Sequence, residues 1–352
     1  SITADDGTID EAAIAKFCRE VAGLRAGGHQ VVMVTSGAIA AGLPAMAFDD
    51  RPRDAVTLQA ISAVGQSRLM AVYDRELAGH GLTAGQVLLA PLDFMVREQY
   101  LHARATIGRL LDLGVVPVVN ENDAIADDEI RFGDNDRLAA LVAHLIRADL
   151  LVLLTDAPGL LTADPRFDAS ASLIEEILEV DHSLEALAGG AGSDRGSGGM
   201  ASKLAAAKIA AWSGVRAVIA QASREDVLAM AVARTNGVGT VVQPRTQRLP
   251  ARKLWIAFAV GAAGTIVVDE GAREALLERN VSLLPAGVVD VKGGFDVEAA
   301  VEIAGPDGKA FAKGLTRYDA AGLREVRGVR TPELPEGSPH EVIHRDDLVV
   351  LP

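Results

Sequence analysis

Residues 29–37 read HQVVMVTSG, a short run rich in Val that ends in a polar turn. A run of this kind predicts a strand, residues 29–35, that is buried on both faces. The same pattern returns four times, with one or more amphipathic stretches between successive runs: 86–89, 115–119, 150–155 and 217–220. Strands that alternate with helices imply right-handed crossovers, so we expect an α/β fold with a largely parallel sheet.

A helix is expected before the first of these strands. Residues 8–11 read TIDE, which matches a capping box, and apolar residues follow at helical spacing from Ile14 to Leu24. The helix should therefore start near Thr8 and stop at Gly27-Gly28.

The chain has 352 residues, more than one hydrophobic core usually holds, so we expect two domains. Residues 243–252 are rich in Pro, Arg and Gln, and short strand-like runs follow at 265–269 and 299–303. We expect a first domain over 1–250 and a small β-rich domain over 260–352.

Composition narrows the function classes. The net charge of −14 repels the phosphates of nucleic acids and anionic lipid surfaces, so neither is an expected partner. A single cysteine, Cys18, forms no internal disulfide and suggests a reducing compartment. No apolar stretch reaches the ~20 residues of a membrane span, and no leader opens the sequence, so we expect a cytoplasmic protein.

A glycine-rich segment could bind phosphate. Gly196 to Gly199 lead into Met200, Ala201, Ser202 and Lys203, at the start of a helix over 204–211. Backbone N–H groups at such an entry can bind phosphate oxygens, although a flexible linker has the same composition. Lys203 lies in the first turn, where the helix dipole disfavours a cation, and this favours a functional role.

Polar clusters follow several of the expected strands. Residues 120–123 read NEND and residues 133–136 read GDND, and the two clusters flank one short segment. Ordinary helix capping explains either cluster alone, but together they could converge on a polar ligand. Ser36-Gly37 and Thr155-Asp156 are equally open to capping or to ligand contact.

Taken in order, these segments resemble the glutamate 5-kinases of the amino-acid kinase family. The resemblance is carried by residues 34–42, 63–69, 120–123, 133–136, 154–156, 159, 162–166, 198–200 and 203 and, in the tail, by 268–272, 282–285 and 344–347. It implies an αβα sandwich with a largely parallel sheet and a small β-rich PUA-like C-terminal domain.

The resemblance also implies a reaction. ATP would phosphorylate the γ-carboxylate of L-glutamate to γ-glutamyl phosphate, the first step of proline biosynthesis, with Mg²⁺ present. A glutamate side chain with a pKa near ~4.3 is already an anionic nucleophile and needs no general base. Alignment and charge neutralisation are then the main tasks of the protein.

By motif position, the glutamate would be held by Ser36, Gly37, Asp123, Asn135 and Asp136. ATP would be held by Thr155, Asp156, Ser197, Gly198, Gly199, Met200, Ala201, Ser202 and Lys203. Lys203 would steady the transferred phosphoryl group, and Asp134 would help to organise the same pocket. The resemblance leaves the metal ligands unknown. In this family a first strand carries a phosphate-binding lysine, and we expect that strand to precede Ser1.

Partners expected from the family are a second copy of the chain, proline as a feedback inhibitor, and glutamate-5-semialdehyde dehydrogenase as recipient of the acyl phosphate. Three alternatives stay open. The chain could be a kinase of the same fold for another carboxylate or phosphate, or a regulatory protein without activity, although Lys203, Asp134, Asn135 and Asp156 are all present. It could also bind RNA through the PUA-like domain, but residues 256–352 carry 10 Lys and Arg against 16 Asp and Glu.

Overall fold

The computed structural model describes residues 2–3, 7–46, 48, 51–125, 135–168, 170–189, 199–246 and 248–351. The chain divides into two compact units, Ser1–Arg248 and Leu249–Pro352, called unit 1 and unit 2 below. Each unit has its own hydrophobic core. Within the described ranges, no helix combines the length and the apolarity that a membrane crossing requires.

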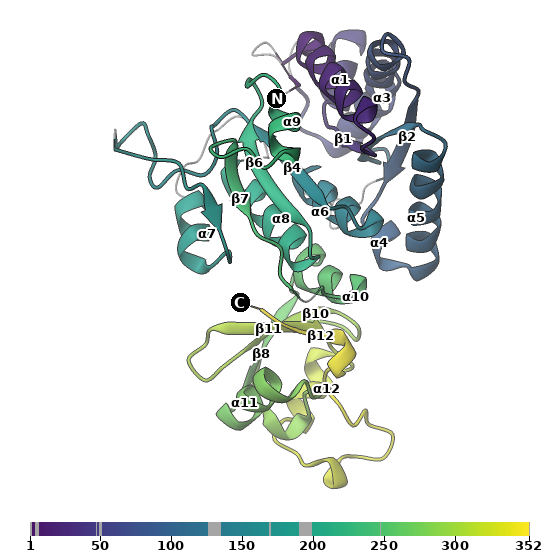
Figure 1. Cartoon of the computed structure of the whole chain (residues 1–352). Helices are drawn as coiled ribbons and strands as arrows, with labels where there is room; N and C mark the ends of the chain where they lie inside the picture. Colours follow the sequence, from purple (N-terminus) through teal and green to yellow (C-terminus); the bar gives the residue numbers. More distant parts are fainter. Residues whose placement is uncertain are drawn as a thin grey trace. The chain divides into compact units, whose positions relative to one another are not determined.

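Unit 1 alternates strands and helices along most of its length (Figure 1). Its helices are α1 (Glu11–Ala26), α2 (Ala38–Gly42), α3 (Ala55–Ala78), α4 (Leu92–Met95), α5 (Arg97–Asp112), α6 (Asn135–Ile146), α7 (His182–Gly189), α8 (Met200–Trp212) and α9 (Val227–Val232), with a 3₁₀ turn at Pro44–Met46. Its strands are β1 (Met33–Val34), β2 (Ala84–Leu89), β3 (Val116–Glu121), β4 (Leu150–Thr155), β5 (Glu176–Ile177), β6 (Arg216–Gln221) and β7 (Gly239–Val242).

The strands of unit 1 form two sheets. In the first, β1 and β2 both pair in parallel with β3, in the order β1-β3-β2. In the second, the order is β4-β6-β7-β5, and β4 is parallel to β6 from Leu150 opposite Arg216 to Thr155 opposite Gln221. The expected α/β class with largely parallel strands is therefore confirmed. The parallel pairing also places the carboxyl ends of β1 and β3 side by side, and the carboxyl ends of β4 and β6 side by side.

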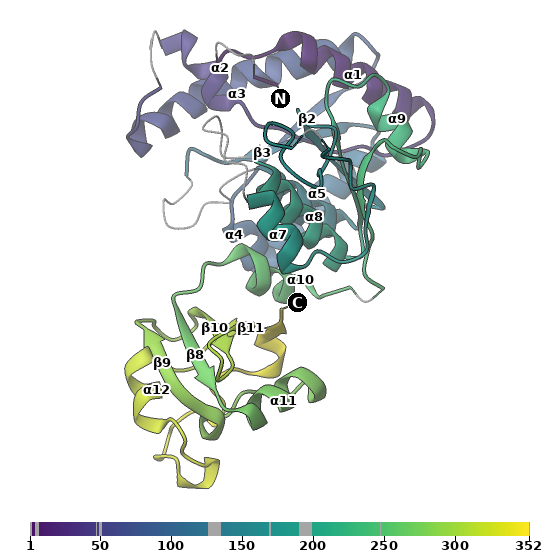
Figure 2. The same cartoon turned by 90° about the vertical axis from the view of Figure 1, so that its left-hand side faces the viewer.

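Helices cover the strands from two sides. Helices α1, α3 and α9 lie on one side and α5, α6 and α8 on the other, as Figures 1 and 2 show from two directions. The first layer is buried through Ile14 and Cys18 of α1 and Leu69, Tyr73 and Leu77 of α3, which pack together against β3. This arrangement is the αβα sandwich expected from the sequence.

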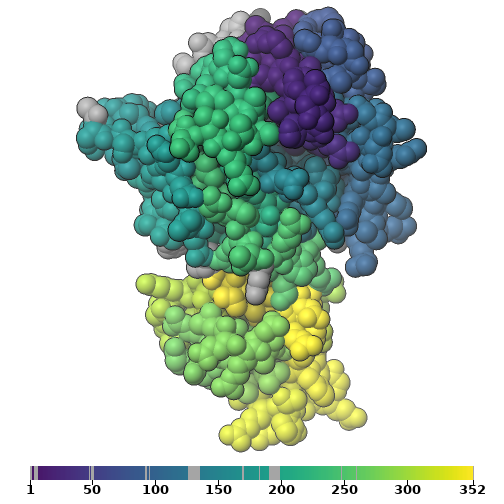
Figure 3. Space-filling view, viewed as in Figure 1, coloured from purple at the N-terminus to yellow at the C-terminus, as the bar shows by residue number. Residues whose placement is uncertain are grey.

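A buried ion pair joins α1 to a segment more than 200 residues later. Lys16 Nζ donates to Glu20 Oε1 at 2.7 Å and to the carbonyl oxygens of Ala222 at 3.0 Å and Arg224 at 2.8 Å. The other oxygen of Glu20 accepts from the backbone N–H of Leu228 in α9 at 3.0 Å. Figure 3 shows the corresponding purple and green surfaces in contact. The pair thus holds the β6–α9 connection against α1.

Two local expectations were wrong. Helix α1 begins at Glu11 rather than near Thr8, because Ile9 forms an antiparallel bridge with Thr3 and Asp10 caps the helix by accepting from Ala13 N–H at 2.9 Å. The first strand spans only Met33–Val34 and is half-buried, because β1 pairs with β3 alone among the described strands. The antiparallel strand β7 was not predicted at all.

Unit 2 is built around a five-stranded sheet in the order β12-β11-β10-β8-β9. Its strands are β8 (Gly264–Val268), β9 (Val288–Gly293), β10 (Ala300–Ala304), β11 (Ala310–Leu315) and β12 (Leu348–Val350). Its helices are α10 (Ala251–Leu254), a π-helical turn (Trp255–Ala259), α11 (Glu270–Arg279) and α12 (Ala320–Val326), with 3₁₀ turns at Pro285–Gly287, Thr331–Glu333 and Arg345–Asp347. The small β-rich module expected from the sequence is confirmed.

Candidate active site

The turn after β1 places Ser36 at the end of the first sheet. Thr35 N–H donates to the carbonyl of Val119 in β3 at 2.9 Å, and its hydroxyl lies 2.7 Å from the hydroxyl of Tyr73 in α3. Gly37 follows with φ of 95°, in the left-handed region that favours glycine, and caps α2. Thr35 is buried while Ser36 is exposed, so the turn presents Ser36 to solvent.

Helix α3 crosses α2 at very short range. A Cβ on Gly65 would lie 1.8 Å from the carbonyl oxygen of Ala38, and one on Gly42 would lie 2.2 Å from that of Ile61. Only glycine permits this approach, because any side chain would overlap backbone atoms. The crossing brings two polar residues of α3, Ser62 and Gln66, to the ends of β1 and β3.

Ser62 and Gln66 contact the cluster that follows β3. Ser62 Oγ donates to Asp123 Oδ2 at 2.7 Å, and Asn120 Nδ2 donates to Gln66 Oε1 at 2.8 Å. Asn135, the first residue of α6, donates in turn through Nδ2 to Asn120 Oδ1 at 2.7 Å. The cluster at 120–123 therefore meets Asn135, which lies in the described part of the second cluster, as the sequence suggested.

Lys203 pairs with Asp136 across two helix N-termini. Lys203 Nζ lies 2.8 Å from Asp136 Oδ2, and the side chains are only 11% and 16% exposed. Ser202 Oγ donates to the same carboxylate oxygen at 3.1 Å. This carboxylate explains how a cation is tolerated in the first turn of α8, where the helix dipole opposes it.

The glycine-rich entry to α8 lies partly outside the described residues. Ser197 and Gly198 lie outside the described residues. Asp134, which comes just before α6 in the sequence, lies outside them too. Gly199 is the N-cap residue of α8 without a side-chain cap, and Met200 and Ala201 form its first turn.

Thr155 and Asp156 lie at the end of β4, beside β6. The carbonyl of Thr155 accepts from Ala222 N–H at 2.8 Å, and the carbonyl of Asp156 accepts from Gln221 Nε2 at 3.4 Å. Asp156 is exposed, and α8 packs against both strands. Backbone contacts thus hold this pair at the edge of the second sheet.

The sequence interpretation assigned no role at this site to three residues that hold it together: Ser62, Gln66 and Tyr73. Burial raises the pKa of Tyr73 to about 12, so its hydroxyl stays neutral and cannot act as a base near pH 7. The spacing of Ser62 and Gln66, four residues apart around Gly65, was the available signal, since such residues share one helix face.

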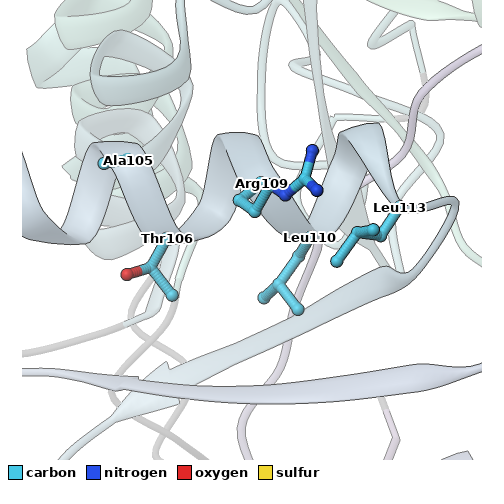
Figure 4. A pocket seen from close by; sticks show the side chains of 5 residues that line it. All are labelled: Ala105, Thr106, Arg109, Leu110 and Leu113. Carbon is cyan, nitrogen blue, oxygen red and sulfur yellow. The ribbon is translucent and has the colours of Figure 1, made fainter.

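A hollow on the surface of unit 1 lies elsewhere. It has a volume of about 360 Å³ and is lined by Ala105, Thr106, Arg109, Leu110 and Leu113 of α5 (Figure 4). None of these residues belongs to the clusters above. The hollow is therefore no part of the candidate site.

Comparison with known proteins agrees with the fold. The model of the amino acid kinase family matches residues 1–221. The chain belongs to the amino acid kinase family. The model of the PUA domain matches residues 264–335, within unit 2. The resemblance inferred from the sequence is thereby confirmed.

Several curated relatives carry the name glutamate 5-kinase. The protein of Burkholderia cenocepacia strain HI2424 is 46% identical over 354 residues, covering 99% of this chain and 95% of the relative. Those of Burkholderia vietnamiensis and Pelobacter propionicus are 45% and 43% identical with the same coverage. The similarity therefore extends over both units.

Proposed function

We propose that the chain transfers the γ-phosphoryl group of ATP to the γ-carboxylate of L-glutamate, the first step of proline biosynthesis. The observation that carries this proposal is the convergence of Asp123, Asn120 and Asn135 at the ends of β1 and β3. Carboxylate and amide oxygens there suit the ammonium group of an amino acid. The relatives named glutamate 5-kinase support the same substrate.

The glutamate site would consist of Ser36, Gly37, Asp123, Asn135 and Asp136. The substrate carboxylate is ionised at neutral pH, so the reaction needs no general base. Asp123 and Asn135 would fix the amino-acid end of the substrate and leave the γ-carboxylate to meet the phosphoryl group. Alignment of this kind supplies much of the rate enhancement in phosphoryl transfer.

The ATP site would consist of Thr155 and Asp156 at the end of β4 and of Ser197 to Lys203 before and within α8. The ammonium group of Lys203 would neutralise the charge on the transferred phosphoryl oxygens, and Asp136 positions this ammonium group at the 2.8 Å contact. Asp134, outside the described residues, is proposed to organise the same pocket.

Mg²⁺ would reach the site with the nucleotide. The described residues contain no group of three or more His, Cys, Asp or Glu that could hold a metal ion. Mg²⁺ at phosphoryl-transfer sites commonly takes its ligands from phosphates, water and one or two carboxylates, so a nucleotide-borne ion does not require such a group. The ion would offset phosphate charge, and we assign it no protein ligand.

The remaining expectations stay predictions. We expect a domain boundary close to residues 250–260, a homo-oligomer, inhibition by proline, transfer of the acyl phosphate to glutamate-5-semialdehyde dehydrogenase, and a cytoplasmic location. A nucleic acid partner is disfavoured by the net charge of −14.

A coupled ADP-release assay on the full-length protein tests the proposal. With ATP and Mg²⁺, L-glutamate should stimulate ADP release strongly, whereas N-acetylglutamate, aspartate, carbamate and UMP should not. A preference for N-acetylglutamate or UMP over L-glutamate would refute the substrate assignment. Nucleotide turnover that no acceptor stimulates would refute the reaction itself.

A further inference from the structure

Three carboxamide side chains form a continuous row across unit 1, from Gln66 in α3 through Asn120 in β3 to Asn135 in α6. The nitrogen-to-oxygen distances along the row are 2.8 Å and 2.7 Å. Gln66 is 7% exposed and Asn120 is 2% exposed, so water cannot replace these contacts. The row reaches from the interior of the helix layer to a residue of the proposed glutamate site.

A backbone group fixes which end of the Asn120 carboxamide is oxygen. The N–H of Glu121 donates to Asn120 Oδ1 at 2.8 Å, so that end of the Asn120 carboxamide must be oxygen. Its NH₂ group must then face Gln66, which has to present Oε1. By the same logic Asn135 has to present NH₂ to Asn120. The amide orientations therefore follow from their hydrogen-bond partners rather than from shape.

The row leaves Asn135 with one kind of hydrogen-bonding group for a ligand. Its Nδ2 donates to Asn120 Oδ1 and to the carbonyl oxygen of Thr35, which accounts for both of its N–H bonds. Only Oδ1, an acceptor, remains to face a substrate. An acceptor suits the α-ammonium group of glutamate and repels either of its carboxylates.

We propose that Gln66 is a positioning residue that acts through Asn120 to hold Asn135 Oδ1 toward the α-ammonium group of the substrate. This inference rests on the proposed function, because it takes L-glutamate as the ligand. It makes the amide row a specificity device that favours an amino acid over a dicarboxylate without an amino group.

The buried NH₂ group of Gln66 supports this role. Among the described residues, Gln66 Nε2 has no hydrogen-bond partner. An apolar side chain of similar volume would avoid that cost, since a buried donor without a partner forfeits its hydration. A polar residue that is locally unfavourable is typical of a functional site. The acceptor that it offers to Asn120 is the compensating contact.

The surrounding backbone makes Gln66 a firm support. Gly65 precedes it at the α2–α3 crossing, where a Cβ would meet the carbonyl oxygen of Ala38 at 1.8 Å. Ser62, one turn earlier, donates to Asp123 at 2.7 Å. The same face of α3 therefore orients both an amide and a carboxylate of the proposed glutamate site.

The test compares Gln66→Met with the unsubstituted protein in the ADP-release assay. Methionine keeps the volume and removes the acceptor for Asn120. We expect the KM for L-glutamate to rise about 10-fold and the KM for ATP to change less than about 2-fold, because the change acts on the ammonium subsite. Glutarate, which lacks the amino group, should inhibit competitively with a Ki that changes less than about 2-fold.

Two further variants sharpen the comparison. Gln66→Glu keeps an acceptor for Asn120 whether it is ionised or protonated, so it should restore much of the glutamate KM. Ser67→Ala alters the next residue of α3, an exposed side chain whose hydroxyl bonds to the Val64 carbonyl of the same helix at 3.1 Å. It should leave both KM values unchanged.

The outcomes separate this inference from the proposed function. If the unsubstituted protein shows no glutamate-dependent turnover, the proposed function fails. If it is active but Gln66→Met keeps its glutamate KM, or weakens glutarate and glutamate equally, the inference is overturned. Should Gln66→Met not fold by circular dichroism, Gln66→Leu takes its place, and unfolding of both variants would show a purely structural role.

Discussion

Replacing Lys203 by methionine tests the central charge of the proposed site. The change keeps most of the side-chain volume and removes the ammonium group that lies 2.8 Å from Asp136 Oδ2. It should act on stability, through the lost ion pair, and on catalysis, through the lost positive charge. The two effects can be measured separately.

The expected loss of stability follows from burial. With side chains 11% and 16% exposed, the pair is largely desolvated, and breaking such a pair costs about 3–5 kcal/mol. Ser202 Oγ lies 3.1 Å from Asp136 Oδ2 but also 2.8 Å from the carbonyl oxygen of Gly199, so its single O–H compensates the carboxylate only in part, and we expect about 3 kcal/mol of the unfolding free energy to be lost. A protein with about 5–15 kcal/mol of stability stays folded after that loss.

The expected loss of activity is larger than unfolding can explain. If Lys203 stabilises the phosphoryl charge, kcat should fall about 100-fold or more, which is about 2.7 kcal/mol of transition-state stabilisation. The KM for glutamate should change little. Urea unfolding followed by circular dichroism gives the stability, and the coupled ADP-release assay gives the rate.

Lys208 on the same helix provides a matched control. Its Nζ lies 2.6 Å from Glu185 Oε1 of α7, with side chains 12% and 37% exposed, so it forms a pair whose carboxylate is more exposed than that of Asp136. Lys208→Met should cost about 1 kcal/mol of stability and leave kcat unchanged. If both variants lower kcat by the same small factor, the catalytic role given to Lys203 is wrong.

Three further predictions concern stability and reactivity. Burial, together with Arg248 and two other arginines nearby, lowers the pKa of His144 from 6.5 to about 4. The unfolding free energy is therefore intact above about pH 6.5 and should fall by up to about 3 kcal/mol as the pH approaches 4. In urea titrations, His144→Gln should show a flatter dependence of the unfolding free energy on pH. Gly65→Ala should lower the melting temperature by several degrees or prevent folding, because its Cβ would lie 1.8 Å from a carbonyl oxygen. Gly108→Ala is the control and should not destabilise the protein, because nothing lies within reach of its Cβ. Equal effects of the two variants in thermal scans would contradict the close crossing of α2 and α3. Burial raises the pKa of the Cys18 thiol to about 12. A disulfide reagent at pH 8 should therefore label Cys18 only after urea unfolds the protein. Rapid labelling of the folded chain would contradict the burial of Cys18.

Local pattern was enough for the fold class and for the clusters that we propose as the site. The Val-rich runs predicted the strands because buried parallel strands need continuous apolar sequence, and the turn residues after them predicted where polar side chains gather. Pattern failed where neighbours in space decide: residues 8–11 resemble a capping box, yet Ile9 bridges to Thr3 and the helix begins only at Glu11. It also missed β7, whose antiparallel pairing with β6 has no signature in a four-residue segment.

Sequence by itself determined the chemical inventory: a glycine-rich segment that leads into a helix carrying Lys203, and the amide and acidic clusters that follow the strands. Tertiary structure alone decided which of these groups meet and which way they face. Asp136 finds Lys203 across 67 positions, and Gln66 finds Asn120 across 54, separations that no local spacing encodes. The orientation of Asn135 depends on the carbonyl oxygen of Thr35 and on Asn120, which is itself fixed by the N–H of Glu121 and by Gln66. Hydrogen bonds depend on distance and direction in space, and only the packing of α3 and α6 around β3 sets those quantities.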